Sequence, residues 1–171
     1  MFSAELVDEA QRLLAELRTR QMMLATAESC TGGLLTGLLT EVPGASDVVE
    51  RGFVTYSNKA KTSCLGVPSQ LLAKHGAVSA EVALAMAEGA LVNSEADLAI
   101  AVTGVAGPGG GSVKKPVGLV WLAIARAGGT PLRTEWRFGD LGRSRIRLEA
   151  LRAALGFVRQ ALDTPAYGQP E

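Results

Sequence analysis

Short apolar segments alternate with amphipathic helical segments along most of the chain, and this alternation limits the fold more than any other feature. Segments of strand length are predicted at 22–27, 52–57, 97–103, 117–126 and 131–138. Helical periodicity occurs around and between them, at 3–19, 34–42, 69–74, 80–92 and 143–162, with a further short helix starting near residue 59. Helices interleaved with five strands predict an α/β protein with a three-layer α/β/α arrangement.

The last two predicted strands indicate that the sheet is mixed. Gly128 and Gly129 lie between them, and such a short connection predicts an antiparallel hairpin. Helices between the earlier strands favour parallel pairing, so a five-stranded, mostly parallel sheet with at least one antiparallel strand is expected. A chain of 171 residues fits one domain, expected over 1–163, and the segment 164–171 is expected to be a flexible tail because it has two prolines and few apolar groups.

Composition excludes several classes of protein. Hydrophobic residues make up 47% of the chain and charged residues 20%, which is the opposite of the composition of disordered chains. The 17 Lys and Arg residues balance the 17 Asp and Glu residues, so we expect no direct binding of nucleic acid through a broad positive field. A single histidine and two cysteines argue against a nitrogen- or sulfur-ligated metal site, and no cofactor is expected.

We expect no targeting or membrane segment in this chain. Glu5, Asp8 and Glu9 lie where a signal peptide would have a basic start and an apolar stretch. The longest apolar run, 117–125, is about half of a membrane span. With only two cysteines, the chain is expected in a reducing, cytoplasmic setting.

The first segment that could carry chemistry is AESCTGG at 27–33, between the first strand and the next helix. Ser29 lies at this junction, and backbone N–H groups from Cys30 to Gly33 are candidates for binding an oxyanion or a phosphate. The more ordinary interpretation is that Ser29 or Thr31 caps the helix. Cys30 is a rival nucleophile, but neighbouring residues of an extended segment point apart, and a lone cysteine is typically a small buried hydrophobe.

The second segment, YSNKAK at 56–61, follows the second predicted strand. If Asn58 caps the helix, Lys61 takes its third position, where the helix dipole and burial would both lower the pKa of the amine. A neutral lysine can act as a general base. Lys59 points to another side of the helix, so only one of the two lysines is expected in a site. The alternative is that both are solvated surface charges.

The third segment, TGVAGPGGG at 103–111, is rich in glycine, which lets backbone N–H groups approach an anion closely. It lacks the GxxxxGK pattern of a phosphate loop, and the alternative is a flexible connection with Lys114 and Lys115 as solvated charges. Ligands of open α/β sheets bind at the carboxyl ends of the strands. The loops after the first three strands are therefore expected to converge.

Four other basic residues have mostly structural interpretations. His75, beside a glycine at the end of a short helix, is expected to have a C-terminal capping role. Arg145 and Arg147 are expected on a solvated face of the last helix. Arg143, at the start of that helix, could reach a phosphate.

Three of these segments, AESCTGG at 27–33, RGFVTYSNKAK at 51–61 and VTGVAGPGGG followed by KPVGLVW within 102–121, together closely resemble the CinA C-terminal domain family. The resemblance extends from the first helix to the last. It implies a three-layer fold with a five-stranded mixed sheet. It also implies hydrolysis of the carboxamide of nicotinamide mononucleotide to nicotinate mononucleotide and ammonia, without a metal, because the enzymatically active members of the family are nicotinamide mononucleotide amidohydrolases.

The resemblance also implies roles for individual residues. The serine of the first motif, the nucleophile, corresponds to Ser29, and Tyr56 and Lys61 match the tyrosine and final lysine of the YSNxxK pattern. With the residues considered above, the expected substrate-binding positions are Cys30, Thr31, Gly32, Gly33, Asn58, Thr103, Gly104, Gly107 and Arg143.

One segment departs from the family pattern. Relatives commonly carry GDR before the last helix, whereas Leu141 and Gly142 here separate the Gly139–Asp140 pair from Arg143. Arg143 is therefore expected only as a phosphate contact. Members with a larger N-terminal domain exist, and this chain resembles the stand-alone form, which we expect to be a homo-oligomer.

The expected mechanism leaves two alternatives open. In it, neutral Lys61 accepts the proton of Ser29, the hydroxyl oxygen attacks the carboxamide, and Tyr56 relays a proton to the departing ammonia. The same residues would serve a Ser/Lys amidase acting on another nucleotide-linked amide. A protein-interaction module associated with competence or DNA damage, without catalysis, is the non-enzymatic alternative.

Overall fold

The computed structural model describes residues 2–164, and these form a five-stranded mixed sheet. The strands are β1 (Leu24–Glu28), β2 (Val49–Val54), β3 (Leu98–Gly104), β4 (Leu119–Arg126) and β5 (Leu132–Arg137), in the order β2-β1-β3-β4-β5. β1 pairs with β2 and β3 in parallel, and the β3–β4 and β4–β5 pairs are antiparallel. Four strands thus run in one direction and β4 runs against them. The predicted five-stranded mixed sheet and its terminal hairpin are confirmed.

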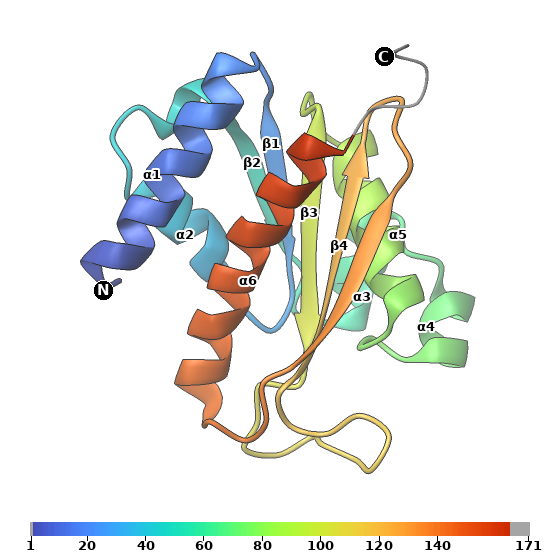
Figure 1. Ribbon diagram of the computed structural model, residues 1–171. Coiled ribbons are helices and arrows are strands. Elements are labelled where there is room, and N and C mark those ends of the chain that lie inside the picture. Colours follow the sequence, from blue (N-terminus) through green and yellow to red (C-terminus); the bar gives the residue numbers. More distant parts are fainter. Residues whose placement is uncertain (1, 165–171) are drawn as a thin grey trace.

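Helices cover both faces of this sheet (Figure 1). They are α1 (Ala4–Thr19), α2 (Leu34–Thr40), α3 (Asn58–Leu65), α4 (Ser69–His75), α5 (Ala80–Val92) and α6 (Arg143–Asp163), with a short 3-10 turn η1 at Ala45–Asp47. α1, α2 and α6 pack on one face, and α3, α4 and α5 lie on the other. The α/β class and the three layers are therefore as predicted.

The two faces of the sheet are packed differently. The face under α1, α2 and α6 carries large side chains such as Leu98, Ile100 and Val102, all fully buried. The face under α5 carries mostly alanines, which let the helix approach the strands closely. Gly89 of α5 continues this close packing, because a Cβ there would overlap the carbonyl of Leu65 in α3. That close approach holds α3, which carries Lys61, against α5.

Most boundaries fall within a few residues of those predicted, and the bounds 80–92 of α5 are as predicted. β2 is the largest error: it occupies Val49–Val54 rather than 52–57, because the alternation of Phe53 to Tyr56 continues past the last residue that pairs with β1. η1 was not predicted. The predicted tail lies outside the described residues except for Thr164, which is the C-cap of α6.

Neither a membrane-spanning helix nor a cluster of metal ligands occurs among the described residues. No helix within 2–164 is both long enough and apolar enough to cross a membrane. In the same range, no three His, Cys, Asp or Glu side chains gather in a way that could hold a metal ion.

Candidate active site

Ser29 and Lys61 meet at the carboxyl end of the parallel strands. Ser29 follows β1 directly, and Lys61 projects from the first turn of α3, which follows β2. The Nζ atom of Lys61 lies 3.0 Å from the Oγ atom of Ser29 and 2.8 Å from the carbonyl oxygen of Thr55. The Ser29 hydroxyl and the Lys61 amine are therefore in direct hydrogen-bond contact, which is the geometry that a serine nucleophile and its base would require.

Lys61 is almost completely enclosed, with only 1% of its surface exposed. No carboxylate within residues 2–164 forms an ion pair with it. Burial lowers the pKa of Lys61 below its ordinary value of 10.5, because the ammonium loses its hydration and gains no counter-ion. The interpretation of Lys61 as a solvated surface charge is therefore wrong, whereas Lys59, two residues earlier, is exposed.

The start of α3 determines where Lys61 lies. Ser57, not Asn58, is the N-cap: its hydroxyl accepts the N–H of Ala60 at 3.0 Å, and Asn58 is the exposed first residue of the helix. The prediction that Asn58 caps α3 is wrong, since the strand ends earlier and the chain turns at Ser57. Lys61 takes the fourth helical position rather than the third, still at the positive end of the helix.

The turn that carries Ser29 is held by the buried carboxylate of Glu28. Its Oε2 atom accepts the N–H groups of Gly33 and Leu35, each at 3.0 Å. Its Oε1 atom accepts the N–H of Thr36 at 2.8 Å and the Thr36 hydroxyl at 2.7 Å. Glu28 therefore caps α2, and the prediction that Ser29 or Thr31 does so is wrong. The N–H of Gly33 is already occupied.

Two backbone donors remain next to Ser29. The N–H of Gly32 bonds to the carbonyl of Ser29 at 3.1 Å, but the N–H groups of Cys30 and Thr31 donate to no other residue within 2–164. The Thr31 hydroxyl is buried and also without a partner among these residues. Burial raises the pKa of Cys30 to about 12, so its thiol stays protonated and is a poor nucleophile. The interpretation of Cys30 as a small buried hydrophobe is confirmed.

Arg143 joins the second and third motifs. Its guanidinium donates to the hydroxyl of Tyr56 and to the carbonyl of Gly107, both at 2.9 Å. Arg143 is the first residue of α6, so the two residues inserted before it leave its side chain within reach of the site. Tyr56 is 62% exposed and stands at the rim. Gly107 has a φ of +76°, and a Cβ there would crowd Val117, so glycine is required at this turn.

Thr103 and Gly104 lie at the end of β3, and the prediction that they bind substrate stays a prediction. The Thr103 hydroxyl is fully buried and donates to the carbonyl of Ala77 at 2.8 Å. A Cβ on Gly104 would lie 2.7 Å from the carbonyl oxygen of Leu119, so a side chain there would disrupt the pairing with β4.

The structure agrees with the predicted role of His75 but not with that of Lys115. His75 ends α4 beside Gly76, and its Nδ1 atom lies 3.4 Å from a carboxylate oxygen of Glu81, in keeping with a role at the helix end. Lys115 is half-buried and donates to the carbonyl of His75, so the expectation of a solvated charge is wrong there.

Sequence reasoning missed two contributors, Glu28 and Arg147. Arg147 donates to the carbonyl of Thr31 at 2.8 Å and its Nε atom is buried, which contradicts the predicted solvated face. One turn of helix separates it from Arg143, and this i, i+4 spacing was the available signal. Glu28 gave none, because a carboxylate that accepts backbone N–H groups looks like any charged residue in a sequence.

Known proteins are similar to this chain in sequence and in fold. The pattern described as the CinA C-terminal domain matches residues 7–162. A CinA-like protein of Akkermansia muciniphila is 52% identical over 149 residues, which are 87% of this chain and 36% of that protein. The chain spans about a third of the length of such curated relatives.

Solved structures of similar length agree with this relationship. The competence/damage inducible protein CihA of Agrobacterium tumefaciens has a TM-score of 0.92 at 51% identity, covering 96% of this chain and 99% of that one. A competence-damaged protein (CinA) superfamily protein of Escherichia coli has a TM-score of 0.87 at 34% identity, covering 94% of each chain. This chain belongs to the CinA C-terminal domain family.

Proposed function

We propose that this chain is an amidohydrolase that converts nicotinamide mononucleotide to nicotinate mononucleotide and ammonia. The observation that carries the proposal is the 3.0 Å contact between the Ser29 hydroxyl and the Lys61 amine. This contact is buried, and burial favours the neutral amine that a general base requires. The choice of substrate rests on the motif resemblance, and the choice of a Ser/Lys mechanism rests on this contact.

The first half of the reaction forms an acyl-enzyme. Lys61 takes the proton of Ser29, and the hydroxyl oxygen attacks the carboxamide carbon. The oxygen that becomes negative is stabilised by the unoccupied N–H groups of Cys30 and Thr31, while the capped end of α2 takes no part. The carbonyl of Thr55 orients the Lys61 amine throughout.

The second half releases the products. The C–N bond breaks as the departing nitrogen takes up a proton, which originates from Lys61 and is relayed by Tyr56 at the rim. Water then attacks the acyl-enzyme with Lys61 again as the base, and nicotinate mononucleotide leaves. No step of this scheme uses a metal or an added cofactor.

The start of α6 supports an anionic substrate. Arg143 and Arg147 both reach the loops of the site, and the first turn of α6 contains no acidic residue. Arg143 is anchored by the Gly107 carbonyl and by the Tyr56 hydroxyl at the open rim, where the phosphate of a mononucleotide would enter. A guanidinium in this position can bind a phosphate in a bidentate manner.

Ammonia release from nicotinamide mononucleotide by the purified protein tests the proposal. Wild type should release ammonia, and Ser29→Ala and Lys61→Ala should each lose nearly all of this activity while remaining folded by circular dichroism. Lys59→Ala is the matched control, because Lys59 is an exposed lysine on the same helix and should leave the rate unchanged.

Assays with other amides separate the proposed substrate from another nucleotide-linked amide and from a protein without catalysis. Nicotinamide riboside lacks the phosphate and should react more slowly if Arg143 binds it, and activity confined to another amide would replace the substrate but keep the Ser/Lys site. Absence of ammonia release from every amide, or an active Ser29→Ala variant, would overturn the proposal and favour a non-catalytic role.

A further inference from the structure

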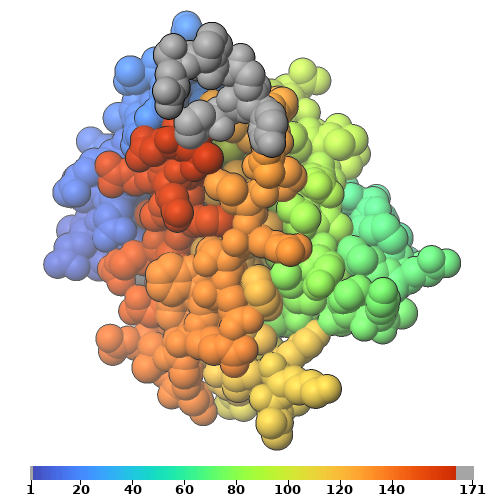
Figure 2. Space-filling view, turned by 45° about the vertical axis from the view of Figure 1, so that its right-hand side comes forward, coloured from blue at the N-terminus to red at the C-terminus, as the bar shows by residue number. Residues whose placement is uncertain are grey.

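β5 is an edge of the sheet whose outer side pairs with no strand of residues 2–164. Figure 2 looks toward this edge, where the orange segment that contains β5 lies at the surface between α6 and α5. The N–H of Phe138 donates to the carbonyl of Gly118 at 3.0 Å, just beyond the last pair of the β4–β5 ladder. Hydrogen-bonded and non-bonded pairs alternate along an antiparallel ladder. In β5 the even-numbered residues therefore bond to β4, and the odd-numbered residues present free backbone groups at the edge.

The side chains of β5 alternate with the same period. The odd-numbered residues are charged and lie on the α5 side of the sheet: they are Arg133, Glu135 and Arg137. The even-numbered residues are mainly apolar and lie on the α6 side: they are Leu132, Thr134 and Trp136. An edge strand with free backbone groups is a template for another strand, and these side chains decide which strand fits.

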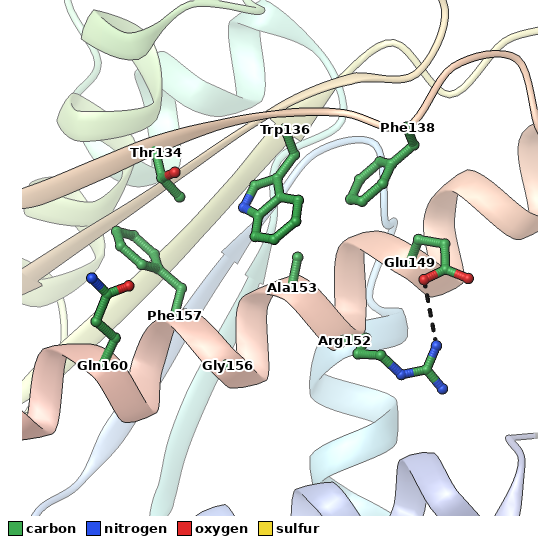
Figure 3. A pocket seen from close by; sticks show the side chains of 9 residues that line it. All are labelled: Thr134, Trp136, Phe138, Glu149, Arg152, Ala153, Gly156, Phe157 and Gln160. Carbon is green, nitrogen blue, oxygen red and sulfur yellow. Dashed lines mark hydrogen bonds and ion pairs between the residues drawn. The ribbon is translucent and has the colours of Figure 1, made fainter.

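The α6 side of β5 is incompletely covered. An apolar groove of about 260 Å³ separates it from α6, lined by Ala153, Gly156 and Phe157 of the helix. Trp136 and Phe138 stack with ring centroids 5.7 Å apart and point toward α6, as Figure 3 shows. Trp136 is still 42% exposed, an unusual amount for an indole beside a core.

The sequence of β5 is complementary to itself in one register. A two-fold axis perpendicular to the sheet keeps every side chain on its own face, so antiparallel copies can be centred on Thr134, Glu135 or Trp136. Centring on Thr134 places Arg133 opposite Glu135 of the partner subunit, twice, on the charged face. On the apolar face it places Leu132 opposite Trp136 of the partner subunit, also twice.

The other two registers are poorer. Centring on Glu135 sets Glu135 against itself and Arg133 against Arg137, so like charges face one another across the junction. Centring on Trp136 pairs Glu135 with Arg137 but leaves the start of β5 opposite residues beyond its end. Of the three registers, only the one centred on Thr134 matches charges and apolar groups over residues 132–136, and it leaves Arg137 opposite Pro131 of the partner subunit.

From this pattern we propose that a second copy of this chain pairs with β5, joining two sheets into one continuous ten-stranded sheet about a two-fold axis at Thr134. The proposal does not depend on the enzymatic one. The Trp136 ring would then cover Leu132 of the partner subunit at the mouth of the groove, and the free backbone groups of Arg133 and Glu135 would become hydrogen-bonded.

Charge exchange tests the register by sedimentation velocity. Wild type should sediment as a dimer at micromolar concentration, and Glu135→Arg should weaken the dimer about tenfold or more because arginines would face one another. Arg133→Glu should do the same. The double variant Arg133→Glu/Glu135→Arg restores opposite charges in the same register and should recover the dimer.

Disulfide crosslinking tests the axis independently. Cys64 is exposed, so the experiment uses a Cys64→Ser background, in which Cys30 remains buried. Thr134→Cys should form a crosslinked dimer under mild oxidation, because non-hydrogen-bonded partners have Cα atoms about 4.5 Å apart, within the range of a disulfide. Glu135→Cys is the matched control and should crosslink poorly.

Each other outcome contradicts the proposal. A monomeric wild type at 100-fold higher concentration would show that β5 has no partner copy. A dimer unaffected by Glu135→Arg would show that the copies meet through another face. Efficient crosslinking through Glu135→Cys rather than Thr134→Cys would place the axis one residue away.

Discussion

Two helices begin beside the Ser29–Lys61 pair, and their N-termini are neutralised to different extents. The N-terminus of α2 receives a buried carboxylate, Glu28, which accepts three backbone N–H groups. The N-terminus of α3 receives only the neutral hydroxyl of Ser57 and carries Lys61 one turn later. The first arrangement fixes the geometry of the turn with Ser29. The second leaves the positive end of a helix next to an amine, which favours its neutral form.

Replacing Lys61 at the start of α3 by arginine should have the largest effect, which is a loss of catalytic activity. Lys61→Arg keeps a cation beside Ser29 but removes a group that can become neutral, so we expect kcat/KM to fall by about 10²- to 10⁴-fold. Steady-state ammonia release would measure it, with the exposed Lys59→Arg as control. Retention of activity would mean that Lys61 acts as a fixed cation rather than as a base.

Removing the charge of Glu28 should have the next largest effect, which is a loss of stability. In Glu28→Gln one oxygen becomes an NH₂ group that faces backbone donors, which leaves N–H groups of α2 unsatisfied in a buried place. We expect a loss of about 2–4 kcal/mol in the free energy of unfolding, measured in urea. Glu41→Gln, an exposed carboxylate at the other end of α2, should change it by less than about 0.5 kcal/mol.

The pH dependence of the reaction should sharpen the role assigned to α3. Because the pKa of Lys61 lies below 10.5, kcat/KM should rise about tenfold per pH unit below that lowered pKa and level off above it. Between the lowered pKa and 10.5 the unfolded chain binds a proton that the folded chain does not. The free energy of unfolding should therefore increase with pH in this window.

Lys61→Ala supplies the reference for that measurement, since it removes the titrating group from both states. The difference in unfolding free energy between wild type and this variant should shift in favour of wild type as the pH rises toward 10.5. A difference that is constant with pH would show that the pKa of Lys61 is the same in both states.

The two helix starts also show what a sequence can reveal. The loops that carry Ser29 and Lys61 were predicted to converge because each follows a predicted strand, and parallel strands bring their following loops together. The motif resemblance then selected these two residues within the loops. The role of Glu28 was not predicted, because which backbone N–H groups it accepts depends on the conformation of the turn between β1 and α2. A residue that bonds to neighbouring backbone has no spacing that marks it.

The same distinction holds for the rest of the fold. The hairpin and α5 were predicted from two glycines and from a serine cap, which act over a few residues. The position of β2 depended on pairing with β1, and the burial of Arg147 depended on how α6 lies against the Thr31 turn. The turn of the hairpin and the start of α5 could thus be predicted from residues at those positions, whereas the end of β2 and the burial of Arg147 depend on contacts with distant segments.

The smallest predicted effect distinguishes the two residues that could cap α3. Ser57→Ala removes the hydroxyl that accepts the N–H of Ala60 and should lower the free energy of unfolding by about 1 kcal/mol, measured in urea. Asn58→Ala should change it by only a few tenths of a kcal/mol, because Asn58 is already inside the helix and alanine has the higher helix propensity. Equal losses in the two variants would contradict a cap at Ser57.

The same substitution tests whether the cap also positions Lys61. In that case Ser57→Ala should reduce kcat more than it raises KM, since a shift of the amine away from Ser29 affects the chemical step rather than binding.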